Sequence, residues 1–396
     1  MRQLFGCALL MSLPLTAQPA TVTFTIDMKE PIAKGWFDPA TETVGVRGAQ
    51  APLNWEETLA ATRVGEGTLY RVTVTFPERP YGGQPVAYKF KVDGKDNPDN
   101  GWEKDRNRLL SLSGATQTVE RAFDAPVPPY PVTFSGTVRV HKDFQSKFLA
   151  PREVQVWLPP GYDKEPERRY PVLYMHDGQN VFDSSQMGME WQVDETAGRL
   201  VEAGAIEPLI VVAVASTEAR TDEYRPYVHE YEEDGRKFKE GGKTGLYARL
   251  LLEELKPFID RTYRTLTDAS HTGVGGASYG GLVSLWLGLH YPDVFGKLIV
   301  SSASARWGDG AILREISALP GKKGLKIWED VGTNEGEDLL LGAREIRDAL
   351  AAKGWKEGVD LQYLEQKGGT HSETAWASRV EGMLRFLFPK PAAVPK

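Results

Sequence analysis

The chain has 396 residues, a length that suits two domains or one large domain with a smaller appendage. Hydrophobic residues make up 41% of it, and 47 basic against 54 acidic side chains give a formal net charge of −7. Because no block of like charge extends beyond a few residues, the composition speaks against a nucleic-acid surface and against binding to an anionic membrane.

The first 20 residues have the pattern of an export signal. Arg2 supplies a positive charge, residues 4–15 form an apolar stretch, and small residues follow at 16–20. The stretch is too short to cross a bilayer as a helix, so we predict a cleaved signal over residues 1–20, with a buried first helix as the alternative. We expect a secreted or periplasmic protein without membrane contact after cleavage. The only cysteine, Cys7, lies in this signal, which predicts no disulfide and no cysteine metal site.

Residues 21–125 have the pattern of a β-sandwich. Short runs alternate apolar and polar residues, and clusters of Gly, Pro and Asn separate them, at 21–26, 69–76 and 86–92. Alternating strands with turn signals between them predict an immunoglobulin-like β-sandwich domain. The proline-rich residues 126–131 favour extended geometry, so we predict a semi-rigid linker there.

Residues 132–388 have the pattern of an α/β domain. After β segments at 132–140 and 154–158, apolar strand runs are predicted at 172–175, 209–214, 272–275, 298–300, 325–328 and 361–364. Amphipathic helices alternate with them, at 245–263, 279–290, 339–353 and 372–387. This alternation predicts an α/β-hydrolase-type doubly wound sheet with helices on both faces. The proline-rich residues 389–396 are predicted to form a disordered tail.

The segment 276–280 reads Gly-Ala-Ser-Tyr-Gly and joins a predicted strand to a predicted helix. The pentapeptide alone is a weak pattern, but this placement is the setting of a nucleophile elbow, where a tight turn exposes a serine hydroxyl. We therefore predict Ser278 as the nucleophile. The amide of Tyr279, at the start of the helix, is the first predicted oxyanion donor. A glycine-rich turn with an ordinary serine is the alternative.

A serine hydroxyl needs a base, and the base needs an orienting carboxylate. Two histidines follow Ser278: His290 lies about three turns along the next helix, whereas His371 lies in the loop after the last strand. We predict His371 as general base and acid. Glu335 comes soonest after the preceding strand and is the predicted triad acid. The alternative acids are Glu337, Asp338, Glu329 and Asp330.

A second oxyanion donor is expected after the strand at 172–175. The chain there reads His-Asp-Gly-Gln-Asn over residues 176–180, and Gly178 permits a close turn. The amide of Gln179 is the candidate. His176 and Asp177 are expected to be structural, because they precede the elbow. We expect neither a cofactor nor a metal ion.

On these motifs, residues 132–388 resemble the esterase family that includes feruloyl, acetyl xylan and enterochelin esterases and the mycolyltransferase antigens. The matching stretches are 174–180, 254–260, 263–265, the serine motif, 332–335 and 368–371. In such relatives the amide after the Asp-Gly pair contributes to the oxyanion hole, which supports Gln179. The position of Glu335 is often aspartate there, and the longer glutamate is a departure from the family pattern.

The N-terminal region resembles starch-binding-type carbohydrate-binding modules, including the glycogen-binding branch. The matching pieces are 52–55, 88–91 and 101–108. The resemblance implies glucose contacts for two tryptophans, a lysine and an asparagine, namely Trp55, Lys89 or Lys91, Trp102 and Asn107. An exposed indole offers a flat apolar face to a sugar ring. The alternative is that both tryptophans belong to the core of the sandwich.

Together these features predict a serine carboxylester hydrolase that acts on an acylated plant polysaccharide, such as feruloylated or acetylated xylan. The expected partners are a polysaccharide or a small-molecule ester, with no nucleic acid. One alternative is an esterase for a siderophore trilactone of the enterochelin type. A second is a carbohydrate-binding protein whose hydrolase domain is inactive.

Overall fold

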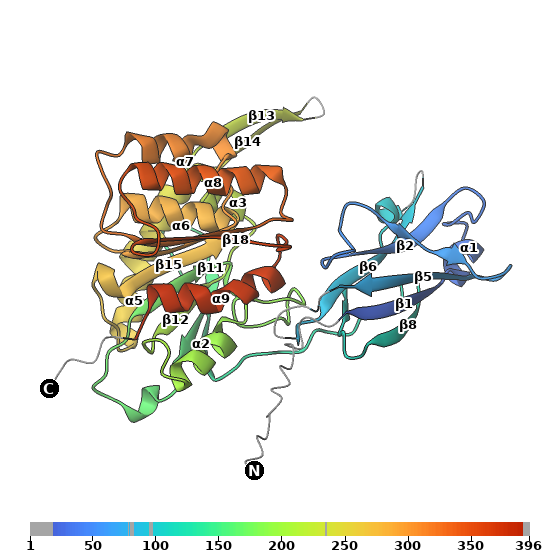
Figure 1. The fold of residues 1–396 in the computed structure, drawn as a ribbon, viewed down its shortest axis with the longest axis horizontal. Helices are drawn as coiled ribbons and strands as arrows, with labels where there is room; N and C mark the ends of the chain where they lie inside the picture. The colour runs from blue at the N-terminus through green and yellow to red at the C-terminus, as the bar shows by residue number, and fades with distance from the viewer. Residues whose placement is uncertain (1–18, 78, 80–82, 95–97, 234–235, 391–396) are drawn as a thin grey trace, which may run out of the picture. The chain divides into compact units, whose positions relative to one another are not determined.

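The computed structural model describes residues 19–77, 79, 83–94, 98–233 and 236–390 (Figure 1). The chain divides into two compact units, Met1–Pro129 and Tyr130–Lys396, and the boundary lies inside the segment predicted as a linker. The predicted export signal falls almost wholly on residues 1–18, and most of the predicted tail on 391–396, so both lie outside the described residues. Within the described part of the chain, no helix combines the length and apolarity needed to cross a bilayer.

The first unit is a β-sandwich of two four-stranded sheets, with orders β4-β5-β1-β8 and β3-β2-β6-β7. Alternate residues of β1, such as Val22, Phe24 and Ile26, are buried between the sheets against Tyr88 and Phe90. The predicted sandwich is therefore confirmed. Its elements are β1 (Ala20–Asp27), α1 (Lys29–Ala33), β2 (Thr43–Gly48), β3 (Leu59–Ala60), β4 (Thr62–Arg63), β5 (Leu69–Phe76), β6 (Val86–Asp93), a 3₁₀ segment (Pro98–Gly101), β7 (Arg108–Leu110) and β8 (Thr116–Ala122).

The second unit is built on an eight-stranded sheet with the order β18-β17-β16-β15-β11-β12-β10-β9. Neighbours from β18 to β12 run parallel, whereas β10 is antiparallel to both β12 and β9. The strands are β9 (Thr137–Phe144), β10 (Arg152–Leu158), β11 (Val172–His176), β12 (Ile210–Val214), β15 (Thr272–Ala277), β16 (Lys297–Ser301), β17 (Lys326–Gly332) and β18 (Leu361–Gln366). A separate hairpin pairs β13 (His229–Glu233) with β14 (Arg236–Glu240).

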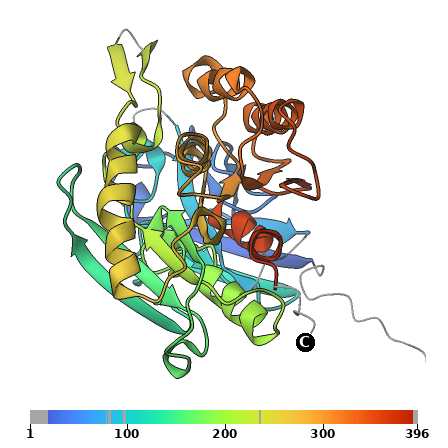
Figure 2. The same cartoon turned by 90° about the vertical axis from the view of Figure 1, so that its left-hand side faces the viewer.

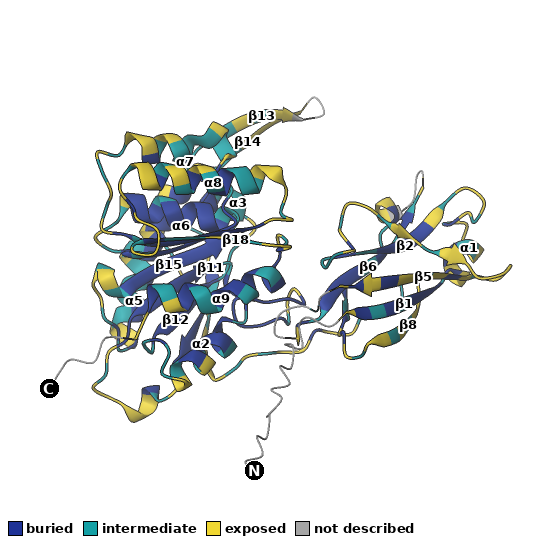
Figure 3. Ribbon diagram, viewed as in Figure 1, coloured by how far each residue is buried: buried dark blue, intermediate teal, exposed yellow. Residues whose placement is uncertain are grey.

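Helices cover both faces of this sheet (Figure 2). Along β11, Val172 and Tyr174 pack in one core, with residues of α6, α7 and α8, while Leu173 and Met175 pack in another, with residues of α2 and α9. The central strands are buried on both sides (Figure 3), which confirms the doubly wound architecture. The main helices are α2 (Val193–Glu202), α3 (Arg220–Tyr224), α6 (Tyr279–His290), α7 (Trp307–Ala318), α8 (Glu337–Ala352) and α9 (Glu373–Leu387).

Two elements differ from the sequence predictions. The helix predicted over 245–263 is divided into α4 (Thr244–Arg249), a π-helical segment (Leu250–Leu255) and α5 (Lys256–Thr262). Pro257, in the first turn of α5, has no amide hydrogen to donate to the preceding turn, and a π-helical turn accommodates it. The strand predicted from residue 132 starts only at Thr137. Before it, the amides of Thr133 and Ser135 donate to side-chain carboxylates instead of to a neighbouring strand.

Candidate active site

Ser278 lies on a strained turn between β15 and α6. Its backbone has φ 59° and ψ −121°, a conformation that residues other than glycine rarely adopt. The glycines around it are needed for space: a Cβ at Gly276 would lie 3.1 Å from the Cβ of His176, and one at Gly281 would lie 2.7 Å from the carbonyl oxygen of Ser301. Glycine at 276 and 281 therefore has a steric cause, because the ends of β11 and β16 lie close to the turn, whereas a Cβ at Gly280 would make only an ordinary contact, 3.4 Å from Asp177 Oδ2.

Ser278 opens onto a cavity of about 310 Å³ at the carboxyl ends of the parallel strands. Its lining brings together loops far apart in the sequence: His176, Asp177, Gln179, Asn180, Met187, Trp191, Arg220, Ala277, Ser278, His371, Glu373 and Trp376. Ser278, His371 and Gln179, predicted from three separate loops, thus share one cavity. Among the described residues no hydrogen bond joins Ser278 to His371, and such bonds are commonly long before a substrate binds.

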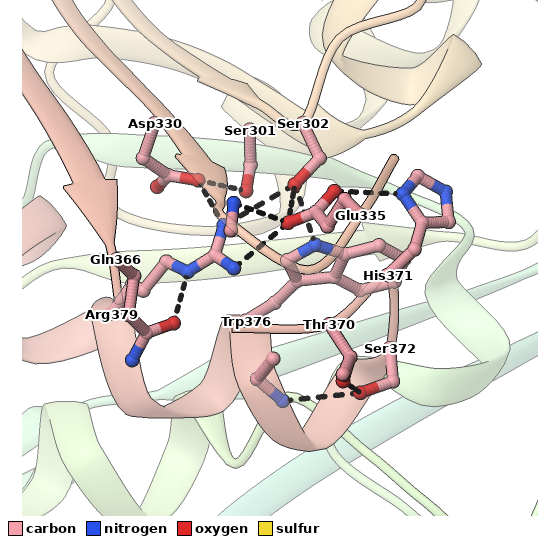
Figure 4. Close-up of polar contacts among 12 residues, drawn as sticks. Ser301, Ser302, Asp330, Glu335, Gln366, Thr370, His371, Ser372, Trp376 and Arg379 are labelled. Atoms are coloured by element: carbon pink, nitrogen blue, oxygen red, sulfur yellow. Dashed lines mark hydrogen bonds and ion pairs between the residues drawn. The ribbon is translucent and has the colours of Figure 1, made fainter. Parts of the chain in front are cut away.

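The imidazole of His371 is held by a buried carboxylate. Its Nδ1 lies 2.9 Å from Glu335 Oε2, and the Glu335 side chain has no exposed area whereas that of His371 is 35% exposed. The other oxygen, Oε1, accepts hydrogen bonds from the Gly332 amide (2.6 Å), Ser302 Oγ (2.8 Å) and Arg379 Nη2 (2.9 Å) (Figure 4).

These contacts keep Glu335 ionised. Burial raises the pKa of its carboxyl, but the hydrogen bond from His371 and the positive charge of Arg379 outweigh burial and hold the pKa below its ordinary value. An ionised Glu335 only accepts, so Nδ1 of His371 carries the proton of their hydrogen bond. Nε2 of His371 is then the nitrogen left free to accept a proton from a nucleophile.

Arg379 is a residue of this site that sequence reasoning missed. It lies on α9, is 2% exposed, and spans two carboxylates, with Nη1 2.6 Å from Asp330 Oδ1 and Nη2 2.9 Å from Glu335 Oε1. Asp330 is therefore paired with Arg379 (Figure 4). No motif marks Arg379 in the sequence, because its role depends on how α9 lies across the end of β17.

The remaining alternative acids, Glu337, Asp338 and Glu329, do not contact His371 in the described part of the chain. Glu337 and Asp338 begin α8, and the 88% exposed Asp338 pairs with Arg306 at 3.1 Å. Glu329 is 1% exposed, and within the described part of the chain neither of its carboxylate oxygens has a hydrogen-bond partner. Of the five acids considered, Glu335 is the one that contacts His371.

Trp376 flanks the imidazole, and it too was missed from the sequence. Its ring meets that of His371 edge to face, with centroids 5.1 Å apart, and its Nε1 donates to Ser302 Oγ at 3.0 Å. On its other side it stacks with Trp191 at 5.3 Å. The two indoles form an apolar wall next to His371 in the cavity that Ser278 also lines.

The two predicted oxyanion donors are backbone amides: Gln179 lines the cavity, and Tyr279 follows Ser278 directly in the chain. Tyr279 is the first residue of α6, so its amide has no acceptor within the helix. Gln179 lies in a 3₁₀ segment, Gly178–Asn180, directly after β11. A Cβ at Gly178 would lie 2.6 Å from the backbone of β12, so only glycine lets this segment pack so closely. The side chain of Gln179 is engaged with Ser216 at 3.0 Å, which leaves its backbone as the polar group of interest.

The residues before Gln179 hold the turn in shape. Asp177 has φ 55° and accepts two hydrogen bonds from Arg220, at 2.6 and 2.8 Å. His176 is 1% exposed, and its Nδ1 lies 2.8 Å from the hydroxyl of Tyr247. Burial, aided by the charge of Arg220, lowers the pKa of His176 to about 3, so this imidazole stays neutral. His290 contacts Glu315 at 2.6 Å at the far end of α6.

The four residues predicted to bind sugar line one cavity of about 590 Å³ in the first unit. The half-buried rings of Trp55 and Trp102 lie 6.1 Å apart at 52°, and Asn107 lies beside them. Lys89 also lines the cavity and donates to the carbonyl of Glu103 at 3.0 Å. Its alternative, Lys91, is not part of this lining.

The family model described as "Putative esterase" matches residues 146–387. Among curated proteins, the chain is 29% identical over 246 residues to the endo-1,4-beta-xylanase/feruloyl esterase of Xylanibacter ruminicola, covering 59% of this chain and 29% of that protein. It is 23% identical over 312 residues to the iron(III) enterobactin esterase of Dickeya dadantii, covering 74% and 63%. The crystal structure of enterochelin esterase from Shigella flexneri matches 95% of this chain and 94% of its own, with a TM-score of 0.63 at 16% identity, which is a likeness of fold.

Proposed function

Because the chain belongs to this esterase family of carboxylic ester hydrolases, we propose that it cleaves esters by a serine mechanism, with Ser278 as nucleophile, His371 as base and Glu335 as orienting acid. The observation that carries the proposal is the contact between His371 and the buried carboxylate of Glu335, beside a cavity that Ser278 also lines. Family membership also sets aside the alternative of a binding protein without hydrolase activity.

In the first half of the reaction, Ser278 Oγ attacks the ester carbonyl carbon while Nε2 of His371 takes the hydroxyl proton. Glu335 stabilises the imidazolium that forms and keeps the ring in the productive orientation. His371 then gives the proton to the leaving alcohol, and an acyl-serine remains. In the second half, His371 activates a water molecule, which releases the acid and restores Ser278.

The negative oxygen of each tetrahedral intermediate requires hydrogen-bond donors. We assign this role to the backbone amides of Tyr279, which directly follows the nucleophile at the start of α6, and of Gln179, which lines the cavity. The N-terminal end of α6 adds a favourable electrostatic contribution near the developing charge. Because both donors are backbone groups, side-chain substitutions at these positions test them poorly.

The test of the mechanism is Ser278→Ala. We expect turnover of a simple aryl ester to fall by about four to six orders of magnitude with an unchanged fold, because the nucleophile is lost. A serine-directed phosphonate should label the unaltered protein at Ser278, and Ser317→Ala, an exposed serine on α7, should label equally. Ordinary hydrolysis by Ser278→Ala, or labelling at another residue, would refute the assignment.

For the substrate we propose an acylated carbohydrate, such as a feruloylated or acetylated xylan. Two observations support it: the cavity with two tryptophans in the first unit, and a relative whose name includes feruloyl esterase. A siderophore trilactone is the second candidate, since the fold match to an enterochelin esterase extends over both units. Comparing kcat/KM on feruloyl, acetyl and trilactone esters decides between them, and a preference for the trilactone would reject the carbohydrate proposal.

A further inference from the structure

Three carboxylates outside the proposed catalytic machinery converge at the start of α2. Glu190, Asp194 and Glu195 each place one carboxylate oxygen within 4.8 Å of the other two. Glu190 and Asp194 are 3% and 0% exposed, and Glu195 is half-buried. Buried carboxylates so close together repel one another unless a proton or a cation lies between them.

The contacts within the protein leave this group incompletely satisfied. Asp194 Oδ2 accepts a hydrogen bond from the Ser135 amide at 2.6 Å, but within the described ranges its buried Oδ1 has no hydrogen-bond partner. Glu195 Oε2 is also buried and has no hydrogen-bond partner among the described residues.

We propose that Glu190, Asp194 and Glu195 form a binding site for a divalent cation, and that the cation is Ca²⁺. The donor set consists of carboxylate oxygens alone, which hard cations prefer, and it holds no histidine or cysteine that would favour zinc or copper. Opposite oxygens around Ca²⁺ lie about 4.6–5.2 Å apart, and the three ligand atoms fit within that span.

The residues around these carboxylates provide a route for the ion and connect the ion site to the cavity at Ser278. A cavity of about 580 Å³ is lined by Asp194, Glu195 and Trp157, so an ion and its remaining water ligands can approach two of the three carboxylates through it. Trp191, the residue after Glu190, lines the cavity at Ser278. A bound cation would therefore join the start of α2 to the segment that forms one wall of the ester-binding cavity.

The test uses the full chain freed of metal with EDTA and then titrated with CaCl₂. We expect the melting temperature to rise by about 5 °C at a free Ca²⁺ concentration a hundredfold above Kd. Tb³⁺, which replaces Ca²⁺ in such sites, should show tryptophan-sensitised luminescence, since Trp157 lines the same cavity, and Ca²⁺ should quench it by competition. Identical melting in CaCl₂ and EDTA without sensitised emission would overturn the proposal and show that the carboxyls share protons instead.

A pair of variants locates the ion. Asp194→Asn keeps the shape but removes one charge, so it should abolish the Ca²⁺ response while melting in EDTA no lower than the unaltered protein, because repulsion is relieved. Asp348→Asn makes the same substitution at an exposed position on α8, outside this cavity, and should keep the full response. An equal Ca²⁺ response in Asp194→Asn would place the ion elsewhere and reject the site. A larger shift with MgCl₂ than with CaCl₂ would reject the assignment of Ca²⁺.

Discussion

At the scale of single residues, the orientation of His371 depends on a charge balance that is completely buried. Two carboxylates, Asp330 and Glu335, share the guanidinium of Arg379, and none of the three side chains is more than 1% exposed. A buried arrangement of this kind adds little net stability when complete, but removing one partner leaves uncompensated charge in a medium that solvates it poorly.

We therefore expect Arg379→Gln to lower the free energy of unfolding by about 3–5 kcal/mol at pH 7. In the variant, Asp330 and Glu335 lose their shared cation, and the pKa of Glu335, which Arg379 helps to hold down, rises. As the pH falls, Glu335 takes up a proton in the variant before it does so in the unaltered protein, so the penalty must shrink toward acid pH. Urea unfolding of both proteins at pH 7 and pH 5 measures this change.

The control is Arg385→Gln, on the same helix, whose exposed guanidinium pairs with Glu381. A surface pair of this kind contributes about 0–1 kcal/mol at either pH. If Arg379→Gln were equally destabilising at pH 7 and pH 5, the loss would reflect packing, and the charge balance around Glu335 would not be its cause.

The residues of the site differ in how far the sequence reveals them. Ser278, His371 and Glu335 were predicted because each is fixed by its position after a strand, and strand ends meet at one edge of a parallel sheet. Arg379 and Trp376 were not, since they act through the face that α9 turns toward β17. Helical periodicity alone cannot tell a buried arginine that supports a carboxylate from an exposed one.

At the scale of elements, the site depends on where α9 begins. His371 lies two residues before the helix, and Ser372 is its N-cap, with Oγ accepting from the Ala375 amide. Thr370 Oγ1 also lies 3.0 Å from Ser372 Oγ, so the cap joins the loop that carries the imidazole to the first turn of the helix. The start of α9 therefore positions His371 as well as stabilising the helix.

For Ser372→Ala we expect a loss of about 1 kcal/mol of unfolding free energy, because one amide of the first turn loses its acceptor. We also expect a lower kcat on an aryl ester with little change in KM, since the imidazole is less well held. Ser372→Thr retains the capping oxygen and should preserve both quantities. Stability and kinetics measured on the two variants check this, and an alanine variant with unchanged kcat would separate the cap from catalysis.

Strands were predicted well where the run of apolar residues in the sequence determines them. The apolar runs that became β11 and β12 are buried on both faces, and such strands carry a continuous apolar signal. The late start of β9 was not predicted, because Thr133 and Ser135 bond to Asp183 and Asp194, some 50 to 59 residues away in the chain. Side-chain contacts of that range leave no local trace in the sequence.

At the scale of the whole molecule, the cavity at Ser278 and the cavity at Trp55 and Trp102 lie in different units and differ in chemistry. The cavity of the second unit combines Ser278 and His371, whereas that of the first combines Trp55, Trp102 and Asn107 without a nucleophile and base pair. If the first retains an insoluble polysaccharide and the second cleaves esters, the two activities are separable by substitution within either unit.

We expect Trp55→Ala and Trp102→Ala each to weaken retention on the insoluble polysaccharide that binds the unaltered protein by about tenfold or more. Losing the face of one indole removes about 1–3 kcal/mol of apolar contact with a sugar ring. Hydrolysis of a soluble aryl ester should remain unchanged in both variants, because neither tryptophan lines the cavity at Ser278. Pull-down on insoluble glucan and xylan, with kcat/KM measured on the same preparations, gives both quantities.

The matched control is Trp36→Ala, which removes a half-buried indole of the same unit that is not part of the 590 Å³ cavity, so retention should persist. Equal retention by all three variants would mean that Trp55 and Trp102 serve packing alone, and the N-terminal unit would lose its proposed sugar site. An unaltered protein that binds neither glucan nor xylan, yet hydrolyses a trilactone, would lead to the same conclusion and would favour the siderophore ester, because a small soluble substrate requires no polysaccharide anchor.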